Sequence, residues 1–269
     1  MNLASALTLA LCVVGTGCSE PPEAPEVGFE FAGEGTQAQL ASHGKRVAAI
    51  VGCRACHGDD LQGKPYAEAF IPDFHSINLT RTVAQLSDAE LEAIIRDGVH
   101  PQRGDLWLMP SGSYHALSER DVAGLIAYLR SEPPQGEVTS NPEVSEESMT
   151  LIAEAGFGTA AFTVSEAQTR PAIDLGPEFA QGRYIAIAAC VACHGSDLTG
   201  IDGMSPDLLS AAVYSEEAFN TLLDEGKASD GRELGLMRLS GPKRFSVMTA
   251  SERKALHAYL LARAEKVGS

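Results

Sequence analysis

Apolar residues recur at intervals of three and four along several parts of the chain. This spacing predicts an amphipathic helix in each of four stretches, residues 42–51, 88–97, 119–130 and 252–264. Ser87 and Ser118 come just before two of these stretches, where a serine hydroxyl can cap the first helical turn. No convincing run alternates between apolar and polar residues, so the pattern predicts an all-α protein.

Two segments of the chain repeat one another. The sequence HGKRVAAIVGCRACHGDDLQG, residues 43–63, matches QGRYIAIAACVACHGSDLTG, residues 181–200. Further along, the stretch QRGDLWLM that ends at Met109 matches DGRELGLM, which ends at Met237, and a helical stretch follows each. A long internal repeat of this kind predicts two copies of one fold in tandem.

The segment between the two copies has the composition of a linker. It begins with EPPQGEVTSNPEVSEES and is rich in acidic residues, although residues 149–162 are apolar enough to pack on one of the domains. We therefore expect five parts: a signal segment (1–18), a flexible acidic tether (19–38), a first domain (39–134), an acidic linker (135–176) and a second domain (177–267).

The N-terminal segment predicts export. Residues 3–17 form an apolar run of signal-peptide length that is too short to span a bilayer. The run ends at Gly17-Cys18 and is followed by SEPPEAPE, which resembles a bacterial lipoprotein signal in which the cysteine becomes the lipidated N-terminus. We expect a periplasmic protein anchored to a membrane through a lipid on Cys18. Cleavage by ordinary signal peptidase is the alternative.

The net charge of −16 argues against a nucleic-acid partner, because binding to phosphates needs clustered Lys and Arg. Much of the acidic excess lies in the tether and the linker, and a solubilising surface is its simplest interpretation. Protein partners with basic docking patches also fit, since complementary charge speeds encounter.

Four of the six cysteines lie in two CxxCH motifs. The motifs consist of Cys53, Cys56 and His57, and of Cys190, Cys193 and His194. CxxCH is the attachment sequence for c-type haem, in which both thiols bond to the porphyrin edge and the histidine binds the iron. The two motifs predict two covalently bound haem c groups.

Other interpretations of a CxxC pair fit less well. Tetrahedral zinc needs two further ligands for each pair, and no other cysteines remain outside the signal segment. A thioredoxin-like redox pair needs an α/β context. One CxxCH can arise by chance, but two inside matched repeats favour haem.

The sixth iron ligand decides what each haem can do. A methionine thioether suits electron transfer, whereas an open position would admit oxygen or peroxide. The repeat places Met109 and Met237 at the same point, so both are candidate ligands; Met204 and Met248 are rivals of Met237. A bis-histidine arrangement would need one of four histidines that we expect at the surface or in loops, His75, His100, His115 and His257.

The motifs CRACHGDDLQGKPY, INLT, LEAIIRDGVH and LMPSGSYHALSERDVAGLIAYLRSEPP, within residues 41–134, resemble a known family. They are similar to the class I cytochrome c domains in cytochrome subunits of bacterial alcohol and aldehyde dehydrogenases; residues 177–266 resemble the same fold more loosely. The resemblance implies three to five helices around each haem, with crossing N- and C-terminal helices. It also implies a backbone carbonyl that orients the proximal histidine, for which Pro206 is the nearest match and Pro72 a weaker one.

The leading functional hypothesis is a one-electron carrier between a redox donor and an acceptor protein, beside a dehydrogenase or an oxidase. No acid/base pair or nucleophile motif stands out in the sequence. The alternative is a dihaem enzyme such as a peroxidase, with an open distal side in the second domain. A haem-based sensor is a third class, with no sequence feature in its favour.

Overall fold

The computed structural model describes residues 27–65, 75–139, 144–154 and 156–268. The predicted signal segment and its candidate lipidation site, Cys18, lie outside these residues. No helix within the described ranges combines the length and the apolar character that crossing a membrane requires.

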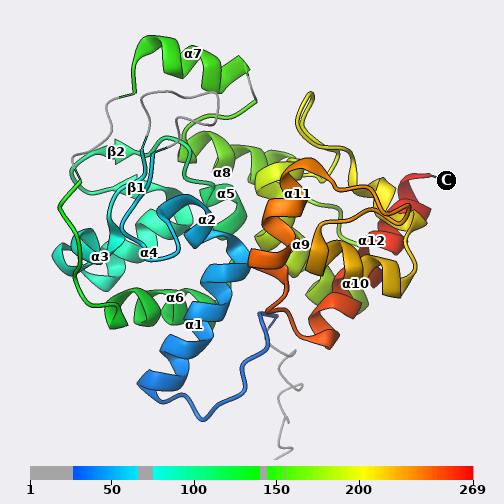
Figure 1. Cartoon of the computed structure of the whole chain (residues 1–269), viewed down its shortest axis with the longest axis horizontal. Coiled ribbons are helices and arrows are strands. Elements are labelled where there is room, and N and C mark those ends of the chain that lie inside the picture. Colours follow the sequence, from blue (N-terminus) through cyan, green and yellow to red (C-terminus); the bar gives the residue numbers. More distant parts are fainter. Residues whose placement is uncertain (1–26, 66–74, 140–143, 155, 269) are drawn as a thin grey trace, which may run out of the picture.

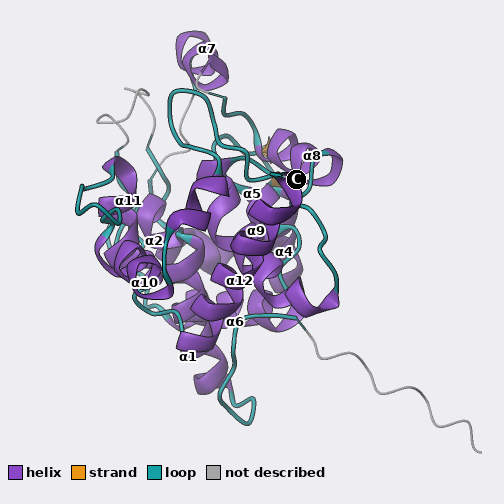
Figure 2. Cartoon of the chain, turned by 90° about the vertical axis from the view of Figure 1, so that its right-hand side faces the viewer, coloured by secondary structure: helices purple, strands orange, loops and turns teal. Residues whose placement is uncertain are grey.

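The described chain is mostly helical, and its two halves lie side by side (Figures 1 and 2). The first half contains α1 (Gln37–Val51), α2 (Cys53–His57), α3 (Leu79–Thr82), the 3₁₀ turn η1 (Val83–Gln85), α4 (Asp88–Asp97), α5 (Ser111–Tyr114) and α6 (Glu119–Ser131). The linker contains α7 (Glu146–Glu154) and α8 (Ala160–Thr169). The second half contains the 3₁₀ turns η2 (Pro177–Phe179) and η3 (Leu208–Val213), α9 (Ala180–His194), α10 (Glu216–Glu225), α11 (Gly235–Ser240), the π-helical turn η4 (Gly241–Phe245) and α12 (Ala250–Val267).

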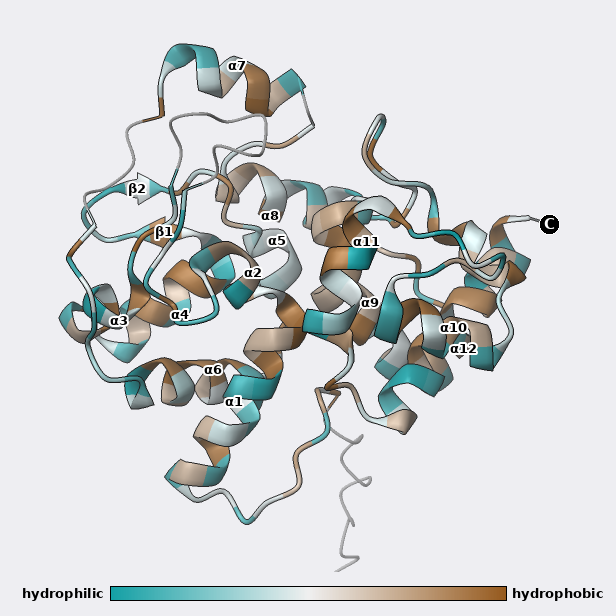
Figure 3. Cartoon of the chain, viewed as in Figure 1, coloured by the Kyte–Doolittle hydropathy of each residue, from teal (hydrophilic) through white to brown (hydrophobic). Residues whose placement is uncertain are grey.

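The four helices expected from the apolar spacing are all present, as α1, α4, α6 and α12. Ser87 accepts a hydrogen bond from the Glu90 amide, and Ser118 accepts one from the Asp121 amide, so both predicted caps are confirmed. Apolar and polar stretches alternate along α1 (Figure 3), as expected for a helix with one buried face. A two-stranded antiparallel ribbon, β1 (Val99–His100) with β2 (Gly104–Asp105), is the small departure from an all-α fold.

The first and last helices of each half cross at a glycine. In the first half, a Cβ added to Gly44 of α1 would lie 1.7 Å from the Gly124 carbonyl oxygen of α6. In the second, a Cβ on Gly182 of α9 would lie 2.1 Å from the Ala255 carbonyl oxygen of α12. Both crossings therefore need a residue without a side chain. The crossing that the family resemblance implies is present in both halves.

The linker packs on the first half, as its apolar middle predicted. Ala160 is fully buried against Gly98, and its amide donates to the Leu106 carbonyl over 2.7 Å. The Gly112 amide of α5 donates to the Thr163 hydroxyl of α8 over 3.0 Å. Helix α8 is therefore a structural part of the first half.

The last residues of the predicted flexible tether are folded, which corrects the expected range of 19–38. Phe29 is buried, its ring packs edge-on against Tyr184 at 5.5 Å, and its amide donates to Asp121 over 2.9 Å. The Gln181 side chain of α9 donates to the Gly28 carbonyl over 2.7 Å. The burial of one aromatic ring fixes this segment between the two halves.

Two buried carboxylates join the halves in a reciprocal way. Asp121 of α6 accepts a hydrogen bond from the Tyr184 hydroxyl of α9 over 2.5 Å. Glu252 stands at the matching place in α12 and accepts two bonds, of 2.8 and 3.0 Å, from the Arg46 guanidinium of α1. Each carboxylate belongs to the last helix of one half and binds the first helix of the other. The two copies of the fold therefore pack against each other in an approximately two-fold arrangement.

Tyr184→Phe tests this interface. Burial raises the pKa of Asp121, but the bonds from His43, Tyr184 and the Phe29 amide outweigh it and the pKa is lowered overall. We expect the variant to lower the free energy of unfolding by about 1.5–3 kcal/mol at neutral pH, the usual contribution of a hydrogen bond to a charged group. The loss should shrink as the pH falls through the folded-state pKa of Asp121, because the ionised carboxylate provides the stability.

Urea unfolding at neutral and acid pH measures both effects. Tyr214→Phe is the control, because that hydroxyl makes no hydrogen bond to any residue the structure describes. Equal stability losses in the two variants would contradict the assigned role of the Tyr184 hydroxyl.

Candidate functional site

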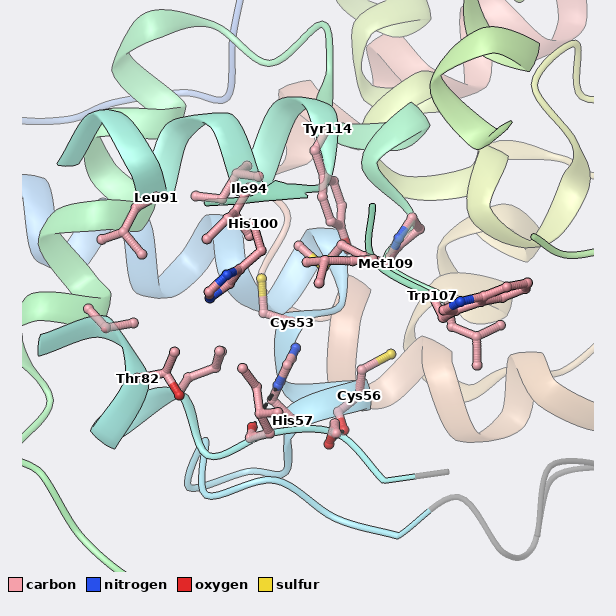
Figure 4. Close-up of a pocket in the computed structure, with 18 of the residues that line it drawn as sticks. Cys53, Cys56, His57, Thr82, Leu91, Ile94, His100, Trp107, Met109 and Tyr114 are labelled. Atoms are coloured by element: carbon pink, nitrogen blue, oxygen red, sulfur yellow. Dashed lines mark hydrogen bonds between the residues drawn. The ribbon is translucent and has the colours of Figure 1, made fainter. Parts of the chain in front are cut away.

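The first CxxCH motif opens onto a mainly apolar cavity of about 350 Å³ (Figure 4). Cys53, Cys56 and His57 of α2 line one side, and Met109, from the loop before α5, lines another. The picture shows His57 and Met109 entering the cavity from opposite sides. The structure thus brings together all four residues that the sequence proposed for the first site.

Backbone geometry orients His57. Its Nδ1 lies 3.0 Å from the Ile77 carbonyl oxygen, which can only accept, so the proton is on Nδ1. The lone pair of Nε2 is then free to bind a metal ion. Burial lowers the pKa of His57, which favours the neutral imidazole. Ser76 supports the same turn by donating to the Cys56 carbonyl over 2.7 Å.

The second motif has the same hydrogen bonds. His194 Nδ1 lies 2.9 Å from the Pro206 carbonyl oxygen, and Ser205 donates to the Cys193 carbonyl. Pro206 therefore makes the contact that the family resemblance implied. In the first half Ile77 makes it, whereas Pro72 lies outside the described residues. A backbone carbonyl can come from any residue type, so no sequence pattern points to Ile77.

The DLxG sequence that follows each motif builds this arrangement. Leu61 and Leu198 both adopt left-handed backbone angles, with φ of 60° and 66°. The amides of Gly63 and Gly200 then each donate over 2.8 Å to the carbonyl of the motif histidine. A Cβ on Gly63 would lie 2.3 Å from the Ser76 carbonyl oxygen, and one on Gly200 would lie 2.6 Å from that of Ser205. The glycine is therefore required by close backbone approach in both copies.

The four motif cysteines form no disulfides. Burial raises the pKa of Cys53 and of Cys190 to about 12. Burial also raises the pKa of Cys193, and the neighbouring Cys56 of the other half adds to that rise. These pKa values disfavour the thiolate, which is the form that attacks disulfides.

The two candidate distal methionines occupy matching places in three dimensions. The Leu106 amide donates to the Gly98 carbonyl over 3.0 Å, and Met109 follows three residues later. In the second half the Leu234 amide donates to the Gly226 carbonyl, also over 3.0 Å, and is followed three residues later by Met237.

The local backbone differs between the two methionines. Met109 lies in a loop between Leu108, with φ of 59°, and Pro110, whereas Met237 lies within α11. Met248, a rival of Met237 in the sequence, is buried just before α12 begins.

Two of the histidines that we expected at the surface or in loops, His100 and His257, are buried. His257 is 7 % exposed, stacks on Phe219 and lies 3.1 Å from the Tyr214 carbonyl. His100 is also 7 % exposed and lines the cavity (Figure 4). His100 Nδ1 accepts from the Gln102 amide over 3.2 Å, so its proton is on Nε2 and neither nitrogen offers a free lone pair. This geometry leaves Met109 as the better candidate for the distal ligand.

Arg103 is a site residue that sequence reasoning missed. It lines the cavity, and its Nε is buried with no hydrogen-bond partner among the described residues. Burial lowers the pKa of its guanidinium, as expected for a cation that lacks an anion. Haem carries propionate carboxylates that can supply the missing acceptor. The cavity thus fits haem through its thiols, its candidate axial ligands, its apolar walls and this cation.

Residues 39–129 match the family model described as "Cytochrome C oxidase, cbb3-type, subunit III". The first half of this protein is similar to a class I cytochrome c domain. The match runs from α1 into α6 and includes Cys53, Cys56, His57 and Met109. A comparison with curated proteins gives no match. The cytochrome c similarity supports covalent haem and electron transfer for the first half.

Gly63→Ala tests whether close backbone approach builds the histidine turn. Gly63 and Gly104 both have positive φ, of 84° and 72°, but nothing lies within 4 Å of a Cβ added to Gly104. We expect Gly104→Ala to lower the free energy of unfolding by about 1–2 kcal/mol, the cost of left-handed backbone for alanine. Gly63→Ala should cost more than about 3 kcal/mol, because the Ser76 backbone must also shift. Urea unfolding of both variants measures the difference, and equal costs would contradict the account.

Proposed function

We propose that the protein is a dihaem c-type cytochrome that carries single electrons between protein partners in the periplasm. The observation that supports two haems is the repeated hydrogen-bond framework around both CxxCH motifs. The same carbonyl, serine and glycine contacts recur at His57 and at His194. The family match supports this function for the first half, and the repeat extends the proposal to the second.

Each half of the chain supplies a similar set of groups. Cys53 and Cys56 would attach one haem, and Cys190 and Cys193 the other. When bound, haem supplies the Fe(III)/Fe(II) couple, which gains and loses one electron. Two methionine thioethers, from Met109 and Met237, would close the distal positions and so favour electron transfer over chemistry on oxygen or peroxide.

The remaining site residues control orientation and solvation. The carbonyls of Ile77 and Pro206 hold the two imidazoles with Nε2 directed away from the backbone. Arg103 would pair with a propionate, and the apolar wall of the first cavity would keep water from the iron. Both the cation and the low polarity affect the redox potential of an enclosed haem.

The packing of the two halves supports electron passage between them. Helix α5 of the first half packs on α9, which carries the second motif, and η4 of the second half packs on α1, which leads into the first. Cys56 and Cys193 lie close enough that the charge of one affects the pKa of the other. The two attachment sites therefore face a common interface, which favours a relay.

Location and partners extend the proposal. The Gly17-Cys18 sequence supports a lipid anchor on the periplasmic side of a membrane. A dehydrogenase as electron donor and an oxidase as acceptor fit a carrier of this kind, and the matched family model carries the name of an oxidase subunit. An acidic chain with a net charge of −16 would suit partners with basic docking surfaces.

The number of covalent haems per chain tests the proposal. After expression with a haem-attachment system, the haem that remains bound to the denatured chain is measured against the protein concentration. We expect two haems in the wild type and one in each of the double variants Cys53→Ala/Cys56→Ala and Cys190→Ala/Cys193→Ala. Cys12→Ala, in the predicted signal segment, is the control and should retain two. A wild type with one haem, unaffected by loss of the second pair, would contradict the dihaem function.

A further inference from the structure

A buried arginine lies between the two haem-attachment segments. Arg244, in η4, is only 8 % exposed. Its Nε and Nη2 donate to the Ile50 carbonyl over 3.0 and 2.8 Å, and Nη2 also donates to the Ala189 carbonyl over 2.9 Å. One side chain thus joins α1 of the first half to α9 of the second.

The two carbonyls lie close to the attachment cysteines. Ile50 is three residues before Cys53, and Ala189 is immediately before Cys190. Gly52 makes room for the contact: it has φ of 91°, and a Cβ there would lie 3.2 Å from Arg244 Nε. The position of the guanidinium is therefore fixed from both halves.

The charge of Arg244 is not neutralised by a neighbouring carboxylate. No Asp or Glu among the described residues lies within ion-pair distance of it, and its partners are carbonyl dipoles and the ring of Phe245, 5.0 Å away. A guanidinium stays charged in a protein interior. Burial raises the pKa of Cys53 and of Cys190, and the Arg244 charge opposes part of that rise at each thiol. Its field therefore reaches both motifs.

On the basis of the proposed dihaem function, we propose that Arg244 is a positioning residue shared by the two haem sites, which holds their attachment segments together and favours the reduced state at both. A fixed positive charge stabilises a neighbouring group that gains an electron. Because the guanidinium is buried, solvent screens this effect only weakly. The matching position in the first half is Ser113, so the cation at this position comes from the second half alone.

Redox titration of variants at Arg244 tests the proposal, with the number of covalent haems counted first in each protein. Arg244→Gln removes the charge and should lower both midpoint potentials. We expect the Fe(II):Fe(III) ratio at a fixed potential to fall at least tenfold. For a one-electron couple, a tenfold fall corresponds to a decrease of about 59 mV in the midpoint potential. Arg244→Lys keeps the charge and should lower the ratio much less than tenfold. Arg232→Gln, at an exposed arginine of the same half, should leave both potentials unchanged.

The outcomes separate the two claims. A wild type with fewer than two haems overturns the dihaem function itself. If two haems are present but Arg244→Gln leaves both potentials unchanged, the role of Arg244 is overturned and the dihaem function stands. A shift at only one haem also contradicts a shared role. If Arg244→Gln fails to fold, Arg244→Lys decides the question. A tenfold fall of the Fe(II):Fe(III) ratio in Arg244→Lys overturns the role of the charge, and midpoint potentials close to those of the wild type support it.

Discussion

The buried carboxylates of Asp121 and Glu252 set the relation between the two halves of the protein. Asp121 is 1 % exposed and accepts bonds from His43, from Tyr184 and from the Phe29 amide. Glu252 is equally buried and binds Arg46. A charged group removed from water is destabilising unless every acceptor is satisfied. Each carboxylate takes a donor from the opposite half, so these contacts favour the arrangement of the halves that the structure shows.

That arrangement of the halves determines where the two CxxCH motifs lie. Because Tyr184 belongs to α9 and Arg46 to α1, the same contacts that satisfy the carboxylates bring these two helices together. Both helices lead into a CxxCH motif. After each motif, the glycine of the DLxG turn lets a later segment of the chain approach closely, and that segment supplies the backbone carbonyl, of Ile77 or of Pro206, that meets the histidine. The interface thus determines where the two sites lie, and the turns determine how each histidine is presented.

Several parts of this account are visible in the sequence. The apolar spacing gives α1, α4, α6 and α12, because the core face of a helix repeats every three to four residues. The duplicated CxxCH gives the candidate attachment residues, because this chemistry needs fixed residue types at fixed spacing. The repeat also places Met109 and Met237 at matching points.

Other parts depend on contacts between distant residues and leave no local pattern. The Ile77 carbonyl orients His57 through the backbone, which carries no residue signature. Arg244, within GPKRFS, has the sequence context of a surface cation, and its burial follows only from the packing of η4 on α1. Phe29 lies in a stretch of tether composition, where one buried ring outweighs the surrounding polarity.

We propose that the two halves form one path for a single electron. The most direct test is rapid delivery of a substoichiometric amount of electrons to the oxidised protein, with the absorption of each haem followed in time. The account predicts that the haem reduced first passes its electron to the other in a phase whose rate does not change with protein concentration. If redistribution occurs only in a phase that accelerates with protein concentration, electrons pass between molecules instead, and the internal relay is contradicted.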